Sequence, residues 1–362
     1  MFLACGPSHE ADRQFMKLYM VRNTAGLVFI VAAIAAVALA VSGGFNPVKG
    51  AVADSTSSND ESSWAPGPWQ PPHELRQTPI WPGPAPDNKV RAPTPERIEI
   101  AHTPDALEGS TSEAAWDVSV PTMTVFPAKG KNRGAAIVVF PGGGFRAVVV
   151  TKQGTEICNW ITSKGITCVL LKYRVPAREN HHWPDECPCN PLQDAQRTIK
   201  LVRSKAHELH IDPAKVGVMG FSAGGFLVAQ TSNIVESAYA PVDAVDALSS
   251  RPDFAIAFYP GHLCREGDVL EPSIKVSKDT PPTFLLQAWD DDVDPVCNST
   301  VYARALDAAG VPSEVHLFAR GGHAFGLREM EHPVGSRWPD LLESWLTAIG
   351  VLPTEATSAS TN

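Results

Sequence analysis

The sequence has little positive charge and few cysteines, and each shortage excludes a class of protein. Its 362 residues carry 30 Lys and Arg against 39 Asp and Glu, a formal net charge of -9 at pH 7. This balance provides no basic surface for nucleic acid. The 7 cysteines are too few for a fold built from disulfides. Cys187 and Cys189 stand closer together than the usual ligands of structural zinc, so we expect no metal site.

An apolar run without charge lies near the amino terminus. It extends from Ala25 to Val41 and follows Lys17 and Arg22. A basic segment followed by an apolar core is typical of a signal peptide, and the run is also just long enough to cross a membrane once. We therefore expect residues 1–53 to be a signal peptide or an N-terminal membrane anchor. The protein would be exported to the periplasm or the exterior, or held at the membrane by this helix.

Residues 54–95 are rich in Pro, Ser and Gly and show neither a helical nor a strand period. Such a composition predicts an extended linker. Trp64, Trp69 and Trp81 would then be scattered linker aromatics; the alternative is that they dock on the following domain or contact a carbohydrate. The folded domain is expected at residues 96–352, followed by a disordered tail at 353–362.

Apolar runs alternate with helical stretches through this domain. The run at 135–140 and the one that begins at Val216 are typical of strands covered on both faces. Other strands are expected at 97–101, 123–126, 166–173, 254–259, 283–288 and 315–319, and helices at 156–164, 192–209, 299–309 and 340–349. This alternation predicts an α/β fold, a mostly parallel eight-stranded sheet with helices on both faces.

Ser222 lies in a Gly-x-Ser-x-Gly segment between the run that begins at Val216 and a helical stretch. Strand, sharp turn and helix in this order are typical of the nucleophile elbow of α/β-hydrolases, where the strained turn demands small residues such as Gly220 and Gly224. The sequence therefore predicts that Ser222 is a nucleophile and that the Ala223 N–H faces a developing oxyanion. The alternative is a tight turn whose serine only caps the helix.

Three consecutive glycines follow the run at 135–140, in Pro141-Gly-Gly-Gly-Phe145. Glycines allow the backbone to turn its N–H groups toward a ligand, and this loop supplies part of the oxyanion hole in α/β-hydrolases. We expect the N–H of Gly143 or Gly144 to act with that of Ala223. The alternatives are a plain turn or a phosphate loop, but the Lys and Ser/Thr of a P-loop are missing.

Four carboxylates follow the strand expected at 283–288. Asp294 precedes Pro295, which predicts a helix N-cap with proline at the first helical position. Periodicity does not choose between Asp290, Asp291 and Asp292 as the acid of a catalytic triad. A calcium loop is the alternative, but the glycine and terminal glutamate of an EF-hand are absent.

His323 follows the last expected strand and stands in a glycine-rich loop. The order Ser222, Asp, His323 is that of α/β-hydrolases and differs from chymotrypsin and subtilisin. Other histidines are weaker candidates for the base. His316 lies within a strand, His262 would line the pocket, and His181 and His182 lie in a polar loop.

Several segments together resemble the acetyl xylan esterase and feruloyl esterase-like branch of the α/β-hydrolases. They are Ile137–Phe145, Leu171–Pro176, Pro191–Arg197, Ile211–Pro213, Val218–Gly225, Arg251–Phe254 and Gly321–Leu327. The resemblance covers about residues 96–352 and implies a serine esterase without cofactor that acts on short acyl esters, such as acetylated xylan or another small ester. Alternatives are a general carboxylesterase, a prolyl-oligopeptidase-like peptidase and an inactive hydrolase-fold binding protein.

The family pattern His-x-x-x-Asp-x-x-Val-Pro, laid on residues 287–295, places the acid at Asp291, with Asp292 as runner-up. Gln287 and Asp294 depart from this pattern, because they stand where the family has His and Val.

In an exported protein, the cysteines suggest a disulfide strap, that is, a disulfide that fastens a loop over the pocket. We expect Cys187 or Cys189 to pair with Cys264 or Cys297, because all four follow strands on the expected active-site side. Cys158 and Cys168 lie in an expected helix and strand, and we expect them to be buried free thiols.

Overall fold

The computed structural model describes residues 63–72, 74–87, 95–102, 111–175, 189–328 and 334–354. The expected leader at 1–53 lies outside these ranges, as do residues 355–362 of the expected tail, His181, His182 and Cys187. Within the described ranges, no helix has both the length and the apolar character that crossing a membrane requires.

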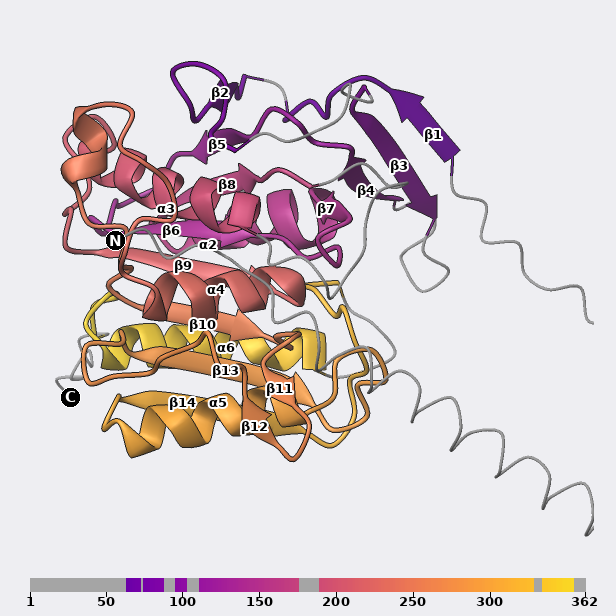
Figure 1. Ribbon diagram of the computed structural model, residues 1–362, viewed down its shortest axis with the longest axis vertical. Coiled ribbons are helices and arrows are strands. Elements are labelled where there is room, and N and C mark those ends of the chain that lie inside the picture. Colours follow the sequence, from indigo (N-terminus) through magenta and orange to yellow (C-terminus); the bar gives the residue numbers. More distant parts are fainter. Residues whose placement is uncertain are drawn as a thin grey trace, which may run out of the picture. The chain divides into compact units, whose positions relative to one another are not determined.

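An eight-stranded sheet forms the centre of the fold (Figure 1), in the order β14-β13-β10-β9-β6-β8-β5-β2. Neighbours from β14 to β8 run parallel, and β5 and β2 join antiparallel at the edge. The prediction of a mostly parallel eight-stranded sheet is confirmed. The strands are β2 (Gln77–Pro79), β5 (Thr122–Phe126), β6 (Ala136–Phe140), β8 (Thr167–Lys172), β9 (Val216–Phe221), β10 (Ala255–Phe258), β13 (Thr283–Ala288) and β14 (Ser313–Phe318).

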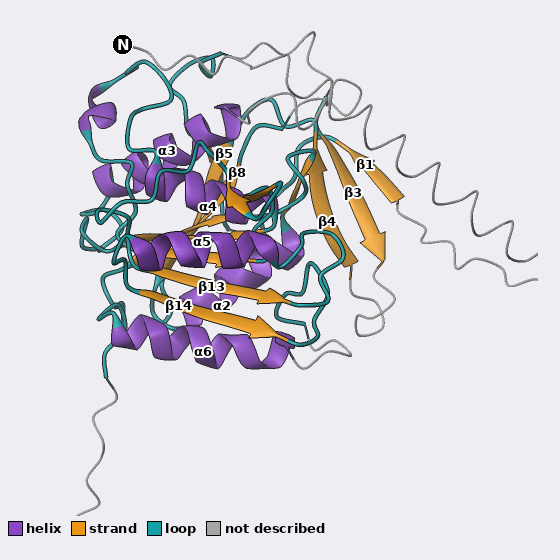
Figure 2. Ribbon diagram, turned by 60° about the horizontal axis from the view of Figure 1, so that its bottom comes forward, coloured by secondary structure: helices purple, strands orange, loops and turns teal. Residues whose placement is uncertain are grey.

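Helices cover both faces of this sheet, as Figure 2 shows. One face carries α3 (Cys189–Ser204), α4 (Ala223–Asn233) and α5 (Cys297–Ala308); the other carries α2 (Glu156–Ser163) and α6 (Val334–Ala348). Trp160 of α2 and Trp338 of α6 are in ring contact at 5.3 Å. Every residue of β6, β8, β9, β10 and β13 is buried, which explains their unbroken apolar runs.

A second, antiparallel sheet has the order β1-β3-β4-β7. Its strands are β1 (Ser63–Pro66), β3 (Arg97–His102), β4 (Thr111–Trp116) and β7 (Ala147–Val149). Because β7 comes shortly after β6, this sheet lies toward the carboxyl ends of the parallel strands; the arrowheads of β13 and β14 point to the same side (Figure 2). A short hairpin, β11 (Cys264–Arg265) with β12 (Val269–Leu270), follows β10. Single turns of π-helix at Thr151–Thr155 and of 3-10 helix at Ala244–Ala247 complete the elements.

The stretch expected to be a linker is part of the folded domain at residues 63–72 and 74–87. It supplies β1 and β2, and Trp69 and Trp81 are 3% and 6% exposed. The Trp81 indole N–H donates to Asp194 Oδ1 at 2.8 Å. The linker prediction is therefore wrong here, because proline-rich backbone with no period of its own is held by side chains that dock on the domain. Trp64 remains exposed.

Two disulfides join cysteines that the sequence reasoning separated. Cys158 pairs with Cys168 and Cys264 pairs with Cys297. The expectation of free thiols at Cys158 and Cys168 is wrong, because α2 packs on β8 and brings their Cα atoms to 5.3 Å. The expected strap to Cys187 or Cys189 is likewise overturned, since Cys264 and Cys297 bond to each other.

Candidate active site

Ser222 occupies the turn between β9 and α4 with φ 54° and ψ -118°. This left-handed backbone is costly for a residue with a side chain and is typical of strained functional positions. A Cβ at Gly220 would lie 2.1 Å from the carbonyl oxygen of Gly224, and one at Gly224 would lie 2.0 Å from that of Phe140. Small residues are therefore required on both sides of Ser222. Its side chain makes no capping hydrogen bond to α4, which removes the capping alternative.

Three side chains form a hydrogen-bonded chain at the carboxyl ends of β9, β13 and β14. His323 Nε2 lies 3.0 Å from Ser222 Oγ, and His323 Nδ1 lies 3.0 Å and 2.9 Å from the two carboxylate oxygens of Asp291. Burial alone would raise the pKa of Asp291. The hydrogen bond from His323 and those from the backbone N–H groups of Asp294 and Val293 outweigh burial, so the pKa is lowered. Asp291 is thereby kept ionised beside the imidazole.

The other two candidate acids lie elsewhere. Asp290 accepts hydrogen bonds at 2.8 Å from the backbone N–H groups of the two glycines that precede His323, Gly321 and Gly322. Asp292 is exposed on the same loop. The structure thus places Asp291, and neither Asp290 nor Asp292, against the histidine.

Asp294 is not the helix N-cap that the sequence predicted. Helix α5 begins at Cys297 after Val296, so Asp294 is not its N-cap. The Ser222 hydroxyl instead donates to Asp294 Oδ2 at 3.2 Å, which also lies 3.7 Å from His323 Nε2. Sequence reasoning missed this second carboxylate at the serine, because the Asp-Pro pair is also a common helix start.

The glycine loop lies directly against Ser222. A Cβ at Gly142 would be 3.1 Å from the Ser222 Cβ, and the Gly142 N–H donates to Gln153 Oε1 at 2.7 Å. Gly143 and Gly144 have φ angles of 128° and 60°, which favour glycine. Among the described residues, the N–H groups of Gly143, Gly144 and Ala223 have no hydrogen-bond acceptor. A ligand would therefore displace no existing partner of these donors in the described part of the chain.

Two buried side chains near the site carried no signal in the sequence. The Tyr259 ring contacts the His323 ring at 4.8 Å, and its hydroxyl donates to the Phe325 carbonyl at 2.7 Å. Gln153 links Gly142 to the Tyr259 hydroxyl, to which its amide donates at 3.3 Å. Together they connect the glycine loop to the histidine loop. Burial, followed by the charge of Asp291, raises the pKa of Tyr259, which keeps the phenol protonated.

Of the remaining histidine candidates, the structure describes His262 and His316. His262 directly follows Gly261, whose N–H donates to the Ser222 carbonyl at 3.2 Å. His262 stacks on Phe145 at 6.1 Å and meets the edge of Phe226 at 5.8 Å. His316 lies in β14 with Nε2 2.7 Å from Glu314 Oε1, as expected for a strand residue.

Comparison with known proteins identifies relatives among esterases. A family model described as BD-FAE matches residues 124–249. An acetylxylan esterase of Xylanibacter ruminicola is 30% identical over 218 residues, 53% of this chain and 41% of the relative. Endo-1,4-beta-xylanase B of Butyrivibrio fibrisolvens is 27% identical over 52% of this chain and 32% of its own length. The chain thus spans less than half of these two curated relatives.

Solved structures match over most of their own length. The acetyl ester-xyloside bifunctional hydrolase of Caldicellulosiruptor lactoaceticus is 31% identical with a TM-score of 0.58, over 76% of this chain and 97% of that one. A thermophilic esterase of the Planctomycetes species Thermogutta terrifontis is 26% identical with a TM-score of 0.57, over 66% of this chain and 91% of that one. The chain carries a BD-FAE domain and belongs to the esterase family of α/β-hydrolases.

Proposed function

We propose that the protein is a carboxylic ester hydrolase that uses Ser222, His323 and Asp291 as a catalytic triad and removes short acyl groups, acetyl above all, from plant-type polysaccharide such as acetylated xylan. The observation that carries this proposal is the hydrogen-bonded chain from Asp291 through His323 to the strained Ser222. A nucleophile, a base within hydrogen-bond reach and an acid that orients the base are the parts that acyl transfer requires.

In the first half of the reaction, Ser222 Oγ attacks the ester carbonyl while His323 Nε2 takes the hydroxyl proton. The tetrahedral intermediate then collapses, and the same nitrogen returns the proton to the departing alcohol. Asp291 holds the other imidazole nitrogen and stabilises the imidazolium. Water attacks the acyl-enzyme by the same route and releases the carboxylic acid, so the chain's own residues suffice without a cofactor.

The negative charge on the carbonyl oxygen requires hydrogen-bond donors near the serine. The N–H groups of Gly143, Gly144 and Ala223 are the candidates. Ala223 directly follows Ser222, and the two glycines follow Gly142, where an added Cβ would lie 3.1 Å from the Ser222 Cβ. None of the three N–H groups has an acceptor among the described residues. Loss of one such donor typically costs about 3–4 kcal/mol of transition-state stabilisation.

The acetylated polysaccharide is supported by relatives rather than by a contact in this chain. Two proteins similar to this one are named acetylxylan esterase and acetyl ester-xyloside hydrolase. We propose export as well, since two disulfides within one domain suit an oxidising compartment. The basic and apolar segment at residues 17–41 would supply the signal or the anchor.

The test is acetate release from acetylated xylo-oligosaccharides and from p-nitrophenyl acetate, for the wild type, Ser222→Ala and the surface control Ser249→Ala. We expect Ser222→Ala to lose at least about 10⁴-fold in kcat on both substrates and Ser249→Ala to match the wild type. Hydrolysis of the nitrophenyl ester alone would refute the polysaccharide substrate and keep the triad. Hydrolysis of neither ester by the wild type would refute the esterase.

The acid is tested by Asp291→Asn beside Asp292→Asn, a loss of the same charge one residue away. Asparagine cannot hold the imidazole in the productive tautomer, so we expect Asp291→Asn to lower kcat by about 10⁴-fold and Asp292→Asn to leave it within two-fold of wild type. An equal effect of the two variants would refute the assignment.

A further inference from the structure

The second carboxylate at the nucleophile, Asp294, is not needed by the triad. Its Oδ2 accepts a hydrogen bond from Ser222 Oγ at 3.2 Å, and its side chain is 14% exposed. Within the described residues, no other side chain donates a hydrogen bond to this carboxylate. The donor is therefore the same hydroxyl that gives up its proton when the acyl-enzyme forms.

Neighbouring groups hold Asp294 in place rather than leaving it at the rim of the site. Its carbonyl accepts a hydrogen bond from Gln287 Nε2 at 2.5 Å, and its N–H donates to Asp291 Oδ1 at 2.9 Å. A Cβ on Gly261 would come within 2.7 Å of the carboxylate, so glycine at that position makes the room. These contacts fix the carboxylate against the backbone on one side and the serine on the other.

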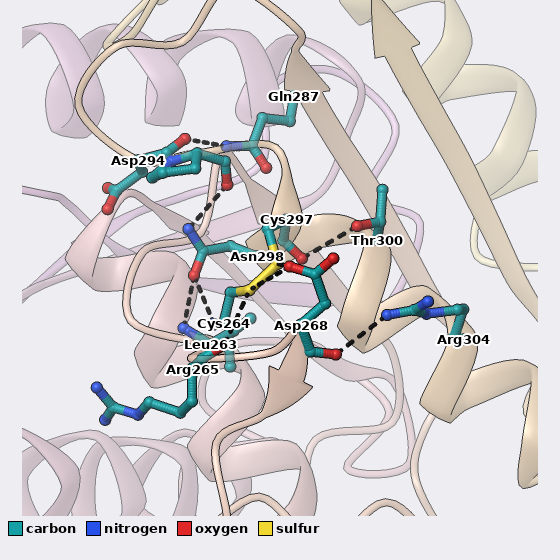
Figure 3. Close-up of a disulfide and its surroundings, with 11 residues drawn as sticks. Leu263, Cys264, Arg265, Asp268, Gln287, Asp294, Cys297, Asn298, Thr300 and Arg304 are labelled. Atoms are coloured by element: carbon teal, nitrogen blue, oxygen red, sulfur yellow. Dashed lines mark hydrogen bonds between the residues drawn. A yellow bond between two sulfur atoms is a disulfide. The ribbon is translucent and has the colours of Figure 1, made fainter.

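The segments that carry Gly261 and Asp294 are tied together (Figure 3). Asn298 Oδ1 accepts hydrogen bonds from the backbone N–H groups of Leu263 and Cys264 at 2.7 Å and 2.8 Å, and its amide donates to the Pro295 carbonyl at 2.9 Å. The Cys264–Cys297 disulfide joins the same two segments covalently. The position of Asp294 is thus built by several independent contacts.

The carboxylate lies beside the path of the departing alcohol. The ester oxygen that leaves must come within about 2.6–3.2 Å of His323 Nε2 to receive its proton, and Asp294 Oδ2 is 3.7 Å from that nitrogen. A hydroxyl on the carbon next to the ester-bearing carbon can therefore reach Asp294. A new hydrogen-bond donor stabilises a partly buried carboxylate most when the existing donor, here the Ser222 hydroxyl, has given up its proton.

We infer that Asp294 recognises the alcohol part of the substrate by accepting a hydrogen bond from a hydroxyl group adjacent to the ester, so that partly acylated polyols are preferred over simple alkyl esters. This inference rests on the proposed esterase function and deepens it. A simple alkyl ester offers no such donor, and the unshielded carboxylate then opposes the negative charge that develops at the carbonyl.

The experiment compares two acetates that differ by one hydroxyl, the monoacetate of a single enantiomer of trans-1,2-cyclohexanediol and cyclohexyl acetate. The two hydroxyls of this diol are equivalent by two-fold symmetry, so acyl migration returns the same compound and does not disturb the rates. The kcat/KM for each ester is measured with the wild type, Asp294→Asn and Asp292→Asn. Asparagine keeps the size of the side chain and one accepting oxygen but loses the charge, so it removes the charge-assisted part of the hydrogen bond, and Asp292→Asn removes an equal charge from the same loop.

We expect Asp294→Asn to lower the preference for the hydroxyl-bearing ester by at least about ten-fold, with cyclohexyl acetate hydrolysed as fast as or faster than by the wild type. Asp292→Asn should keep the wild-type preference. Activity of Asp294→Asn on cyclohexyl acetate also shows that the variant is folded. An unchanged preference in Asp294→Asn, or equal gains or losses on both esters, would overturn the inference. If the wild type hydrolyses no ester, the proposed function is refuted, and the inference that rests on it is refuted as well.

Discussion

Asp290 Oδ1 accepts a hydrogen bond from the backbone N–H of Gly321 at 2.8 Å, and the same atom accepts a second one from the N–H of Gly322 at 2.8 Å. This contact joins the loop after β13 to the loop that carries His323. Asp290 thereby positions the histidine loop, although it does not itself touch the imidazole.

We expect Asp290→Ala to lower kcat by about ten-fold or more, because a small displacement of a catalytic group is costly in rate. Asp290→Asn retains an accepting oxygen and should restore most of the activity. Steady-state kinetics on p-nitrophenyl acetate provide the measurement, with Asp292→Ala as the matched control. Equal kcat values for Asp290→Ala and the wild type would contradict this role.

The stabilities contributed by Asp291 and Asp294 should depend on pH with opposite signs. Hydrogen bonds from His323 and the backbone outweigh burial and lower the pKa of Asp291, so it stabilises the fold above the unfolded pKa of about 3.9 and loses that contribution as the pH falls. Burial, and to a smaller extent the charge of Asp291, raise the pKa of Asp294. Asp294 therefore lowers the free energy of unfolding progressively as the pH rises from the unfolded pKa of about 3.9 to the folded pKa, and by the full amount above it.

Thermal unfolding from pH 3 to pH 7 tests the two opposite pH dependences. Asp291→Asn should lower Tm by several degrees at pH 7 and by much less near pH 3. Asp294→Asn should raise Tm by a few degrees at pH 7, with the gain disappearing below about pH 4. Parallel pH profiles for the two variants would refute the opposite signs.

The sequence was most informative where burial alone decides the structure. The strands at residues 283–288 and 255–258 are covered on both faces, so their apolar runs carry the signal by themselves. The positions of Ser222 and His323 follow from the same logic, because residues that end parallel strands meet at one edge. That logic leaves Asp290, Asp291 and Asp292 open as the acid, and the choice of Asp291 rests on the resemblance to the esterase pattern.

What the sequence did not predict depends on contacts between distant segments. Trp81 reaches Asp194 across 113 residues, and nothing in the proline-rich composition around it indicates that partner. Asp294 meets Ser222 across 72 residues, while its local pattern favours a helix cap. Cys158 and Cys168 pair because a helix packs on a strand, which spacing alone does not determine.

The two disulfides should differ in the stability they contribute. In the chain-entropy account, the cost of closing a loop in the unfolded state grows with its length, and the sequence separations are 10 for Cys158–Cys168 and 33 for Cys264–Cys297. These lengths correspond to about 2.7 and about 3.7 kcal/mol at 25 °C.

Urea unfolding of the double variants Cys158→Ala/Cys168→Ala and Cys264→Ala/Cys297→Ala measures both contributions. We expect the second to lose about 1 kcal/mol more than the first. The second should also weaken the preference assigned to Asp294, because that disulfide joins its segment to the one after Gly261. The same preference in both double variants would show that the remaining contacts, those of Asn298 among them, hold these segments together without the disulfide.

The arm at residues 63–87 is expected to be required for a stable domain. Trp81 is buried, meets Tyr239 edge-on at 4.7 Å and donates to Asp194, whose carboxylate also pairs with Arg174. Truncating a buried tryptophan to alanine typically costs about 3–5 kcal/mol. Replacement by phenylalanine keeps most of the ring volume and removes the hydrogen bond to a charged group, for about 1.5–3 kcal/mol.

We therefore expect the free energy of unfolding to fall in the order wild type, Trp81→Phe, Trp81→Ala, as measured by urea unfolding. Trp64→Ala is the comparison on the same arm. Trp64 is 39% exposed, and its contacts with the Trp116 ring and the Arg97 guanidinium should cost about 1–2 kcal/mol to lose. If Trp81→Ala were as stable as Trp64→Ala, the arm would be a covering that the domain does not need. The order expected here would instead make the arm part of the core, because the Trp81 indole donates to Asp194 and its ring lies 5.9 Å from the Arg174 guanidinium of the buried Arg174–Asp194 pair.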